Sequence, residues 1–273
     1  MNLKYQLMQV SPIVCFSLFV FSLGFLSVFL TYFFRKYKPI KFLNGHNEVT
    51  GYTFLSVSTF YSLLLGFVVY LIWNQYYTVR LNADMEGGIA KTLYRTIKFY
   101  PDKNVSEKLK KHFLVYIDNI VHEEYPEMNY GRLSPKSIKS FHTLYLEIEN
   151  IKPKNEYEIS IATKILDQVE SLSICRGLRL TSLRSQIPGP IWLPIIFGCI
   201  FTLILAAMLE IENMSLHLII SFFLGASISM FLFILVQLDQ PFTGQFRLHP
   251  VELEQIFLFE NWNKTSSQYS PPI

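Results

Sequence analysis

The 273-residue chain has little charge for its length. Charged side chains make up 16% of its residues, against about 25% in an average soluble domain. The formal net charge is only +3, and the basic residues alternate with acidic ones, so no phosphate-binding stripe is indicated and we expect no nucleic-acid partner. Hydrophobic side chains make up 51% of the chain. The shortage of charge therefore favours a protein that lies largely in a lipid bilayer.

Cysteine is also scarce. Cys15 and Cys199 fall within apolar runs and Cys175 stands alone, which excludes a disulfide framework and a cysteine-based zinc cluster. The motifs of common enzymes are missing too, because the chain has no glycine-rich phosphate loop and no Gly-x-Ser-x-Gly elbow. We therefore expect no cofactor and no enzymatic activity.

One local cluster could suggest a metal site, since His122, Glu123 and Glu124 are consecutive. Consecutive residues of a helix point about 100° apart, so the three side chains cannot converge on one ion. We interpret the cluster as a solvated helix end and expect no metal site.

Long runs without formal charge are what the chain has in abundance. A helix needs about 20 apolar residues to cross a bilayer, and four runs are long enough: Tyr5–Phe34, Val49–Val79, Ser185–Leu209 and Asn213–Leu238. Backbone polar groups in lipid must be satisfied within the segment, which favours helices. The first run is too long for the apolar part of a signal peptide, so we expect it to be retained. The predicted spans lie near residues 11–34, 52–76, 190–209 and 215–237.

The segment between the second and third spans has helical periodicity. Met85, Ile89, Leu93 and Ile97 recur at every fourth position, and a second apolar stripe runs from Leu109 to Val121. Ser134 followed by Pro135 is typical of a helix start, and Asn155 is a candidate N-cap for a further long helix. The fold class predicted is an all-α integral membrane protein with four transmembrane helices and an inserted, mainly four-helix domain. The expected divisions are 1–79 (spans 1 and 2), 80–184 (inserted domain), 185–238 (spans 3 and 4) and 239–273 (tail).

Four motifs in a fixed order carry a resemblance. Residues 47–80 begin with an Asn-Glu-x-x-Gly entry, continue as an apolar span and end on Trp-x-Gln-Tyr. "EEYP" follows at 123–126, "RGLRLTSLRSQIPGPIW" at 176–192 and "LDQPFTG" at 238–244. Together these stretches resemble the bestrophin-like family of bacterial membrane proteins, with Tyr125 in place of the tryptophan usual there. The resemblance gives a structural role to Glu123, Glu124, Pro126, Pro188, Trp192, Asp239, Pro241, Phe242 and Gly244.

The last of these motifs stops an apolar run abruptly. A carboxylate deeper in the bilayer would be costly, so Asp239 is expected where the fourth helix leaves hydrocarbon. Pro241 has no amide donor and ends regular helix, while Gly244 permits a turn with positive φ. Phe242 is then expected to fold back onto the inserted domain. Asp239 is either a simple helix stop or the partner of an arginine such as Arg184.

The resemblance implies an oligomeric anion channel, and the second span is the candidate pore helix. Its bulky residues Val57, Phe60, Tyr61 and Leu64 are the pore-lining candidates, because apolar side chains can form a hydrophobic constriction. A stripe of small residues at Ser58, Ser62 and Gly66 is more typical of a helix-packing face. Packing and pore lining can occupy different faces of the same helix.

Charged residues near the spans have two interpretations. Arg176, Arg179 and Arg184 precede the third span, where they could contact phospholipid or form a basic ring at a pore mouth. Asn47 and Glu48 precede the second span, where they could line the opposite mouth or simply cap the helix. The basic loop 35–41 places the inserted domain outside by the positive-inside rule, whereas the family resemblance places it in the cytoplasm, which we adopt.

The function predicted is that of a homo-oligomeric bestrophin-like ion channel in the lipid bilayer, conducting inorganic anions such as chloride or bicarbonate. The expected location is the bacterial inner membrane, as a multi-pass protein. The alternative is a non-conducting membrane scaffold or sensor whose helical domain binds a partner. A continuous axial cavity lined by the second span would distinguish the two.

Overall fold

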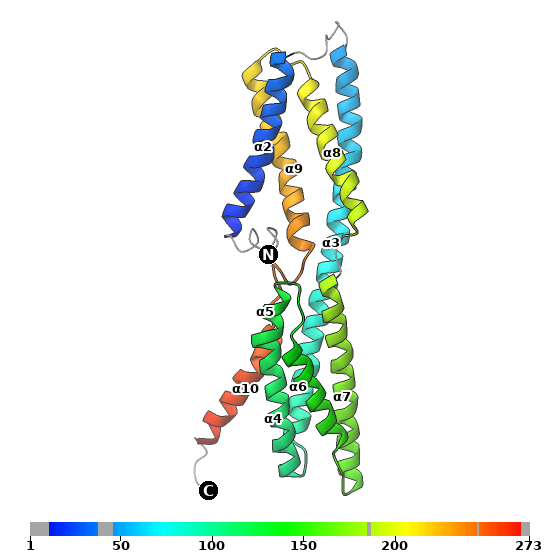
Figure 1. Cartoon of the computed structure of the whole chain (residues 1–273), viewed down its shortest axis with the longest axis vertical. Helices are drawn as coiled ribbons and strands as arrows, with labels where there is room; N and C mark the ends of the chain where they lie inside the picture. Colours follow the sequence, from blue (N-terminus) through cyan, green and yellow to red (C-terminus); the bar gives the residue numbers. More distant parts are fainter. Residues whose placement is uncertain (1–10, 38–45, 185–186, 245, 269–273) are drawn as a thin grey trace. The chain divides into compact units, whose positions relative to one another are not determined.

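Helices joined by turns and loops, with no strand, make up the part of the chain that its computed structural model describes, residues 11–37, 46–184, 187–244 and 246–268. The described side chains exclude those of residues 12, 184 and 261–268. Within these residues, four helices are long and apolar enough to cross a membrane. They are α2 (Pro12–Tyr37), α3 (His46–Lys98), α8 (Gly189–Met208) and α9 (Met214–Leu238), shown in Figure 1. The predicted all-α membrane fold is confirmed.

Two compact units divide the chain. The membrane unit comprises Met1–Tyr76 and Gln186–Gln240, and the helical unit comprises Tyr77–Ser185 and Pro241–Ile273. Helix α3 contributes its first part to the membrane unit and its last part to the helical unit.

In the membrane unit, α2 and α9 lie side by side because small residues let their backbones approach (Figure 1). A Cβ atom built on Gly225 of α9 would lie 2.6 Å from the carbonyl oxygen of Leu23 on α2. The Thr31 hydroxyl donates to Ser221 Oγ at 2.9 Å and so links the two helices by a buried hydrogen bond. Gly225 therefore permits the close approach of α9 to α2.

Helices α3 and α8 share the second packing interface of the membrane unit. The Tyr61 ring lies against Gly198, where a Cβ atom would approach Tyr61 Cδ2 to 2.3 Å. Leu65 and Ile72 of α3 are buried in the same apolar cluster as Ile195 of α8. One face of α3 is thus committed to the interior of the membrane unit.

The helical unit is built from the last part of α3 and several shorter helices. Two predicted helix starts are confirmed: the Ser134 side chain caps α6 and the Asn155 side chain caps α7, where it accepts from the Glu158 amide at 2.8 Å. The remaining elements of the unit are α4 (Lys103–Asn119), η1 (Ile120–Glu124), α5 (Tyr125–Met128), α6 (Pro135–Glu149), α7 (Glu156–Thr181), η2 (Ser182–Arg184) and α10 (Val251–Gln268).

The predicted apolar stripe at the end of α3 is wrong in its first position. Met85 is 55% exposed, whereas Glu86 is fully buried together with Leu93 and Ile97. A spacing of four residues advances about 40° around the helix at each step, so a strict four-residue repeat drifts off the buried face. The buried stripe follows alternating steps of three and four residues and contains a carboxylate.

Helix α10 was not predicted, because the tail carries no strong helix-start signal. It packs on α3 at Gly87, where a Cβ atom would lie 2.3 Å from the Glu252 Cβ. Leu253 and Ile256 of α10 are buried in the core of the helical unit. Gly87 therefore permits the close approach of α10.

Candidate functional site

The membrane part of α3 has a broad exposed face. Phe60 is 74% exposed, and Leu63, Phe67 and Tyr70 follow it along the same side of the helix at 58–61%. Successive steps of three and four residues place these side chains on one stripe. The stripe contains no charged residue, because α3 carries no formal charge between Glu48 and Arg80.

The pore-lining candidates do not all share this exposed face. Phe60 is well exposed, Val57 and Leu64 are partly exposed at its edge, and Tyr61 is 5% exposed. Tyr61 packs within the membrane unit against Gly198, as described above. The stripe of exposed side chains includes Phe67, which the sequence analysis did not single out.

Serine and threonine hydroxyls in the membrane part of α3, between Thr50 and Ser62, donate to carbonyl oxygens of their own helix. Thr53, Ser56 and Thr59 donate to the carbonyl oxygens four residues earlier at 2.9, 2.9 and 2.7 Å. The exposed face therefore presents little free hydrogen-bonding capacity despite these residues. Gly66, in the small-residue stripe, has no heavy atom within 4 Å of a built Cβ among the described residues. Ser62 of this stripe is also exposed, whereas Ser58 is partly buried.

Asn47, at the start of α3, holds the turn between α8 and α9. Its amide nitrogen donates to the Glu210 carbonyl at 3.1 Å, and its amide oxygen accepts from the Glu210 backbone nitrogen at 2.9 Å. Arg35 of α2 donates to the Ile211 carbonyl in the same turn. Glu48 is exposed beside Asn47. Asn47 thus joins the start of one span to the end of another.

Arg179 of α7 lies in a buried charge cluster rather than at a free surface. It is fully buried and donates to both carboxylate oxygens of Glu86 on α3, one of them at 3.0 Å. It also donates to Glu124 Oε1 at 2.5 Å. Arg176 completes the cluster by donating to Glu124 Oε2 at 2.5 Å.

The cluster corrects the view that Arg176 and Arg179 face lipid or a pore mouth. Both are buried in the helical unit, at 7% and 0% exposure, and each is paired with a carboxylate. A guanidinium neutralised in this way contributes little positive potential to a distant surface. The side chain of Arg184, the third candidate, lies outside the described side chains.

The ionisation of the cluster follows from its geometry. Burial alone would raise the pKa of the Glu124 carboxyl, but Arg179 and Arg176 outweigh it and hold that pKa below its usual 4.5. Burial would likewise lower the pKa of Arg179, yet Glu86 and its neighbours raise it well above its usual value. Glu124 and Arg179 are therefore both charged near neutral pH.

A widened turn points Glu124 into this cluster. Residues Ile120–Glu124 form a π-helical turn, closed by a hydrogen bond from the Tyr125 amide to the Ile120 carbonyl. Pro126 follows and lacks the amide that would bond the His122 carbonyl in a regular helix, which favours a local distortion. Glu123 stays outside and pairs with Lys136 at 2.5 Å. The prediction of a solvated helix end is thus correct for Glu123 and wrong for Glu124.

The closing motif behaves largely as its residues predict. The Asp239 carboxylate accepts a hydrogen bond from the Ile187 amide at 2.7 Å, next to Pro188 at the start of α8. Gly244 has φ 75°, which confirms its predicted turn. Phe242 is buried in the helical unit, with its ring 6.1 Å from that of Tyr125, which confirms its predicted position.

The structure also describes two other residues of these motifs, Trp192 and Pro241. Trp192 packs, partly buried, against the apolar cluster of the membrane unit, and the Pro241 carbonyl accepts from the Leu248 amide at 2.9 Å. Pairing between Asp239 and Arg184 stays a prediction, because the arginine side chain is not described. Among the described residues, no group of three or more His, Cys, Asp or Glu side chains could hold a metal ion.

Comparison with known proteins agrees with this architecture. A crystal structure of a bacterial bestrophin homologue from Klebsiella pneumoniae, in a single-residue variant, has a TM-score of 0.61 at 13% sequence identity, covering 90% of this chain and 96% of the homologue. Another variant of that homologue has a TM-score of 0.60 at 13% identity, covering 94% and 100%. Comparison with curated proteins gives no match. The Bestrophin-like domain family matches residues 20–253. The chain therefore belongs to the Bestrophin-like family and has the fold of the bacterial bestrophin homologues.

Proposed function

We propose that the protein is a homo-oligomeric channel that conducts inorganic anions, of the chloride or bicarbonate class, across the bacterial inner membrane. The exposed, uncharged face of α3 is the observation that carries this proposal. Family membership and the fold shared with bestrophin homologues support a channel architecture.

The exposed face has the chemistry of a hydrophobic constriction. Phe60, Leu63 and Phe67 project from it, and the hydroxyls of α3 bond to their own backbone instead of offering ligands to an ion. A narrow ring of such side chains gates conduction by repelling water rather than by binding the ion. Tyr61 is removed from the proposed lining because it packs inside the chain, and Val57 and Leu64 border the lining at its edge.

A ring requires several copies of the chain. One subunit leaves the α3 face uncovered, and cyclic symmetry would bring equivalent faces around a common axis. The uncovered Ser62 and Gly66 positions would suit close contact with a neighbouring helix. In this assembly, α3 would contact a neighbouring helix at Ser62 and Gly66 and would line the pore with its exposed apolar face.

Preference for anions rests on family membership. The buried arginines Arg176 and Arg179 do not supply it, because each is neutralised by a carboxylate. Chloride and bicarbonate are thus the classes to assay first, with a cation as the comparison.

The test is ion flux in liposomes reconstituted with the purified full chain. Phe60→Ala is expected to raise flux severalfold, and Leu64→Ala to raise it less, because a smaller side chain lowers the dewetting barrier. Phe231→Ala removes a 47% exposed ring from α9, outside the proposed lining, and should leave flux unchanged.

Stability must be measured on the same samples. Tyr61→Ala is expected to lower thermal stability through a cavity beside Gly198 without raising flux through the folded fraction. A well-folded wild type and Phe60→Ala variant that both pass no ion, across a range of pH and voltage, would contradict the channel and favour the scaffold.

A further inference from the structure

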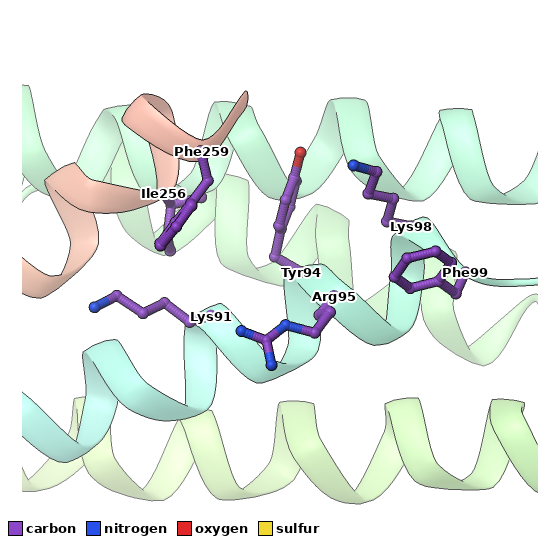
Figure 2. A pocket seen from close by; sticks show the side chains of 7 residues that line it. All are labelled: Lys91, Tyr94, Arg95, Lys98, Phe99, Ile256 and Phe259. Atoms are coloured by element: carbon purple, nitrogen blue, oxygen red, sulfur yellow. The ribbon is translucent and has the colours of Figure 1, made fainter. Parts of the chain in front are cut away.

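A cavity of about 190 Å³ lies in the helical unit, between α3 and α10. Its lining residues are Lys91, Tyr94, Arg95, Lys98, Phe99, Ile256 and Phe259. Figure 2 shows the side chains of Ile256 and Phe259 extending from α10 toward α3, which supplies the three cations and Tyr94, while Phe99 directly follows α3.

The charge of the cavity has one sign. Among its lining residues are three cations and no acid. Lys91 is engaged, since it pairs with Glu252 and donates to Gln255 at 2.6 Å. Arg95 and Lys98 form no ion pair within the described part of the chain. They lie three residues apart on α3, so their stems are neighbours on one side of the helix.

Glu260, an acid bonded to the lining residue Tyr94, also pairs with a cation outside the cavity. Glu260 of α10 accepts from the Tyr94 hydroxyl and pairs with Lys110 at 3.0 Å. The burial of Tyr94 and its bond to Glu260 raise the pKa of the phenol, so the phenol stays neutral. The cavity is left with the uncompensated charge of Arg95 and Lys98.

The walls of the cavity are apolar. Ile256 is fully buried and Tyr94 nearly so, whereas Phe99 is 70% exposed and Phe259 50% exposed at the rim. Pockets for drug-sized ligands measure roughly 300–1,000 Å³, so this one suits a smaller molecule. An occupant that satisfies both features has an anionic group for the cations and a short hydrophobic body for the rings.

We propose that this cavity binds a small amphipathic anion, a carboxylate or phosphate monoester with a short aliphatic or aromatic body. The head group lies between Arg95 and Lys98, and the body lies against Phe99, Ile256 and Phe259. Because the walls come from two helices, an occupant bridges α3 and α10 and stabilises their contact. The site is separate from the proposed conducting face and does not depend on it.

Benzoate is the probe, titrated into the full-length protein in a neutral detergent and followed by calorimetry and by the shift in Tm. Wild type is expected to bind benzoate, while acetate lacks the body and benzyl alcohol lacks the charge, so each should bind at least tenfold more weakly. Arg95→Gln combined with Lys98→Gln should weaken benzoate binding at least tenfold, and Phe99→Ala should weaken it less.

The matched control is Lys103→Gln combined with Lys111→Gln, which removes two exposed cations of α4 with the same change in net charge. This control should bind benzoate as wild type does. Equal losses in the two double variants, absence of benzoate binding to wild type, or binding of benzyl alcohol as tight as that of benzoate would overturn the proposal. Arg95→Glu, with a wild-type circular dichroism spectrum, provides a second test should the double variant fold poorly.

A lipid head group and a soluble anion share this chemistry. The titration is therefore repeated in nanodiscs of phosphatidylcholine, with and without phosphatidylglycerol. Each protein is compared in the two kinds of nanodisc. The control Lys103→Gln/Lys111→Gln keeps the cavity, so a lipid that competes for the cavity must weaken benzoate binding in both proteins. If phosphatidylglycerol weakens benzoate binding to wild type but not to this control, a specific site is contradicted. If phosphatidylglycerol weakens benzoate binding to both proteins, the cavity binds a lipid head group. If benzoate binding is unchanged in both proteins, the cavity binds a soluble anion.

Discussion

Arg179 holds a full positive charge where no solvent reaches it. A buried guanidinium is tolerated only when carboxylates and good hydrogen-bond geometry offset its lost hydration. Glu86 and Glu124 supply both, and the guanidinium also lies 4.9 Å from the Tyr125 ring centroid. With Arg176, the four charges of the cluster come from α3, the π-helical turn and α7, so the cluster ties together parts of the helical unit that are distant in sequence.

Removing one member should therefore be severe. Arg179→Ala is expected to destabilise the protein by roughly 3–5 kcal/mol, because it leaves the buried Glu86 carboxylate without a cation and Glu124 with Arg176 alone. Thermal unfolding of the purified protein measures this as a lower Tm. Lys136→Ala breaks the exposed pair with Glu123 and should cost less than about 1 kcal/mol. Similar losses for the two variants would show that the cluster is not buried as described.

Acid should weaken the same cluster. Glu124 has a pKa below its usual 4.5 in the folded state, so its contribution to stability is fully present above that pH. The contribution is lost as pH falls through the lower pKa of the folded carboxyl, where protonation becomes favourable. The contribution of Glu124 to Tm is expected to stay constant between about pH 5 and 8 and to decrease at more acidic pH. Glu124→Gln should have a lower Tm near neutrality and a shallower fall in acid.

The positions of Arg176 and Arg179 along α7 indicate from the sequence that both arginines are buried, although the family motifs do not. Ile165, Val169 and Leu172 form a buried stripe on α7, and Arg176 and Arg179 continue it at steps of four and three. A charge in the apolar register of a helix predicts burial with a partner. The partner could not be read from the sequence, because it depends on which helices pack together and on the extra residue in the turn before Tyr125.

At the scale of elements, prediction worked where local chemistry is sufficient. The four spans followed from length and apolarity, and α6 and α7 from their caps at Ser134 and Asn155. It failed where tertiary contacts decide. Helix α10 is stabilised by packing on α3 at Gly87, and the orientation of Tyr61 depends on a glycine that lies far away in the sequence.

Two adjacent glycines of α3 allow a matched test of that packing. Gly87→Ala is expected to lower Tm by several degrees, because its Cβ would lie 2.3 Å from the Glu252 Cβ and within 3.4 Å of its backbone. Gly88 has no heavy atom within 4 Å among the described residues, so Gly88→Ala should be neutral or stabilising by up to about 1 kcal/mol through helix propensity. The opposite order of stabilities would place α10 elsewhere.

At the scale of the whole molecule, assembly and sidedness are the properties to test. The uncovered face of α3 predicts a closed homo-oligomer. Light scattering of the detergent-solubilised protein should give a mass of several subunits, and crosslinking in native membranes should give the same number. A monomer in both measurements would contradict the oligomer and, with it, the pore.

Two arguments predict opposite orientations in the membrane. The basic loop 35–41 places the inserted domain outside the cytoplasm, whereas the family architecture places it inside. A reporter fused after Asn263 is expected to be active in the cytoplasm, on the same side as the inserted domain. A second reporter in the turn between α8 and α9 should be active only outside it. The reverse pattern would mean that the positive-inside rule of the loop determines the topology.

The widened turn at Ile120–Glu124 also limits how this gene can change. A π-helical turn holds one residue more than the α-helix around it, so deleting a single codon there could restore regular helix. Such a deletion would rotate the helix before the turn by about 100° relative to the helix after it, and Glu124 could not face Arg179 while Phe113 and Ile117 kept their places in the core. We therefore expect the extra residue and the arginine to be inherited together, so that related chains that lose one have also lost the other.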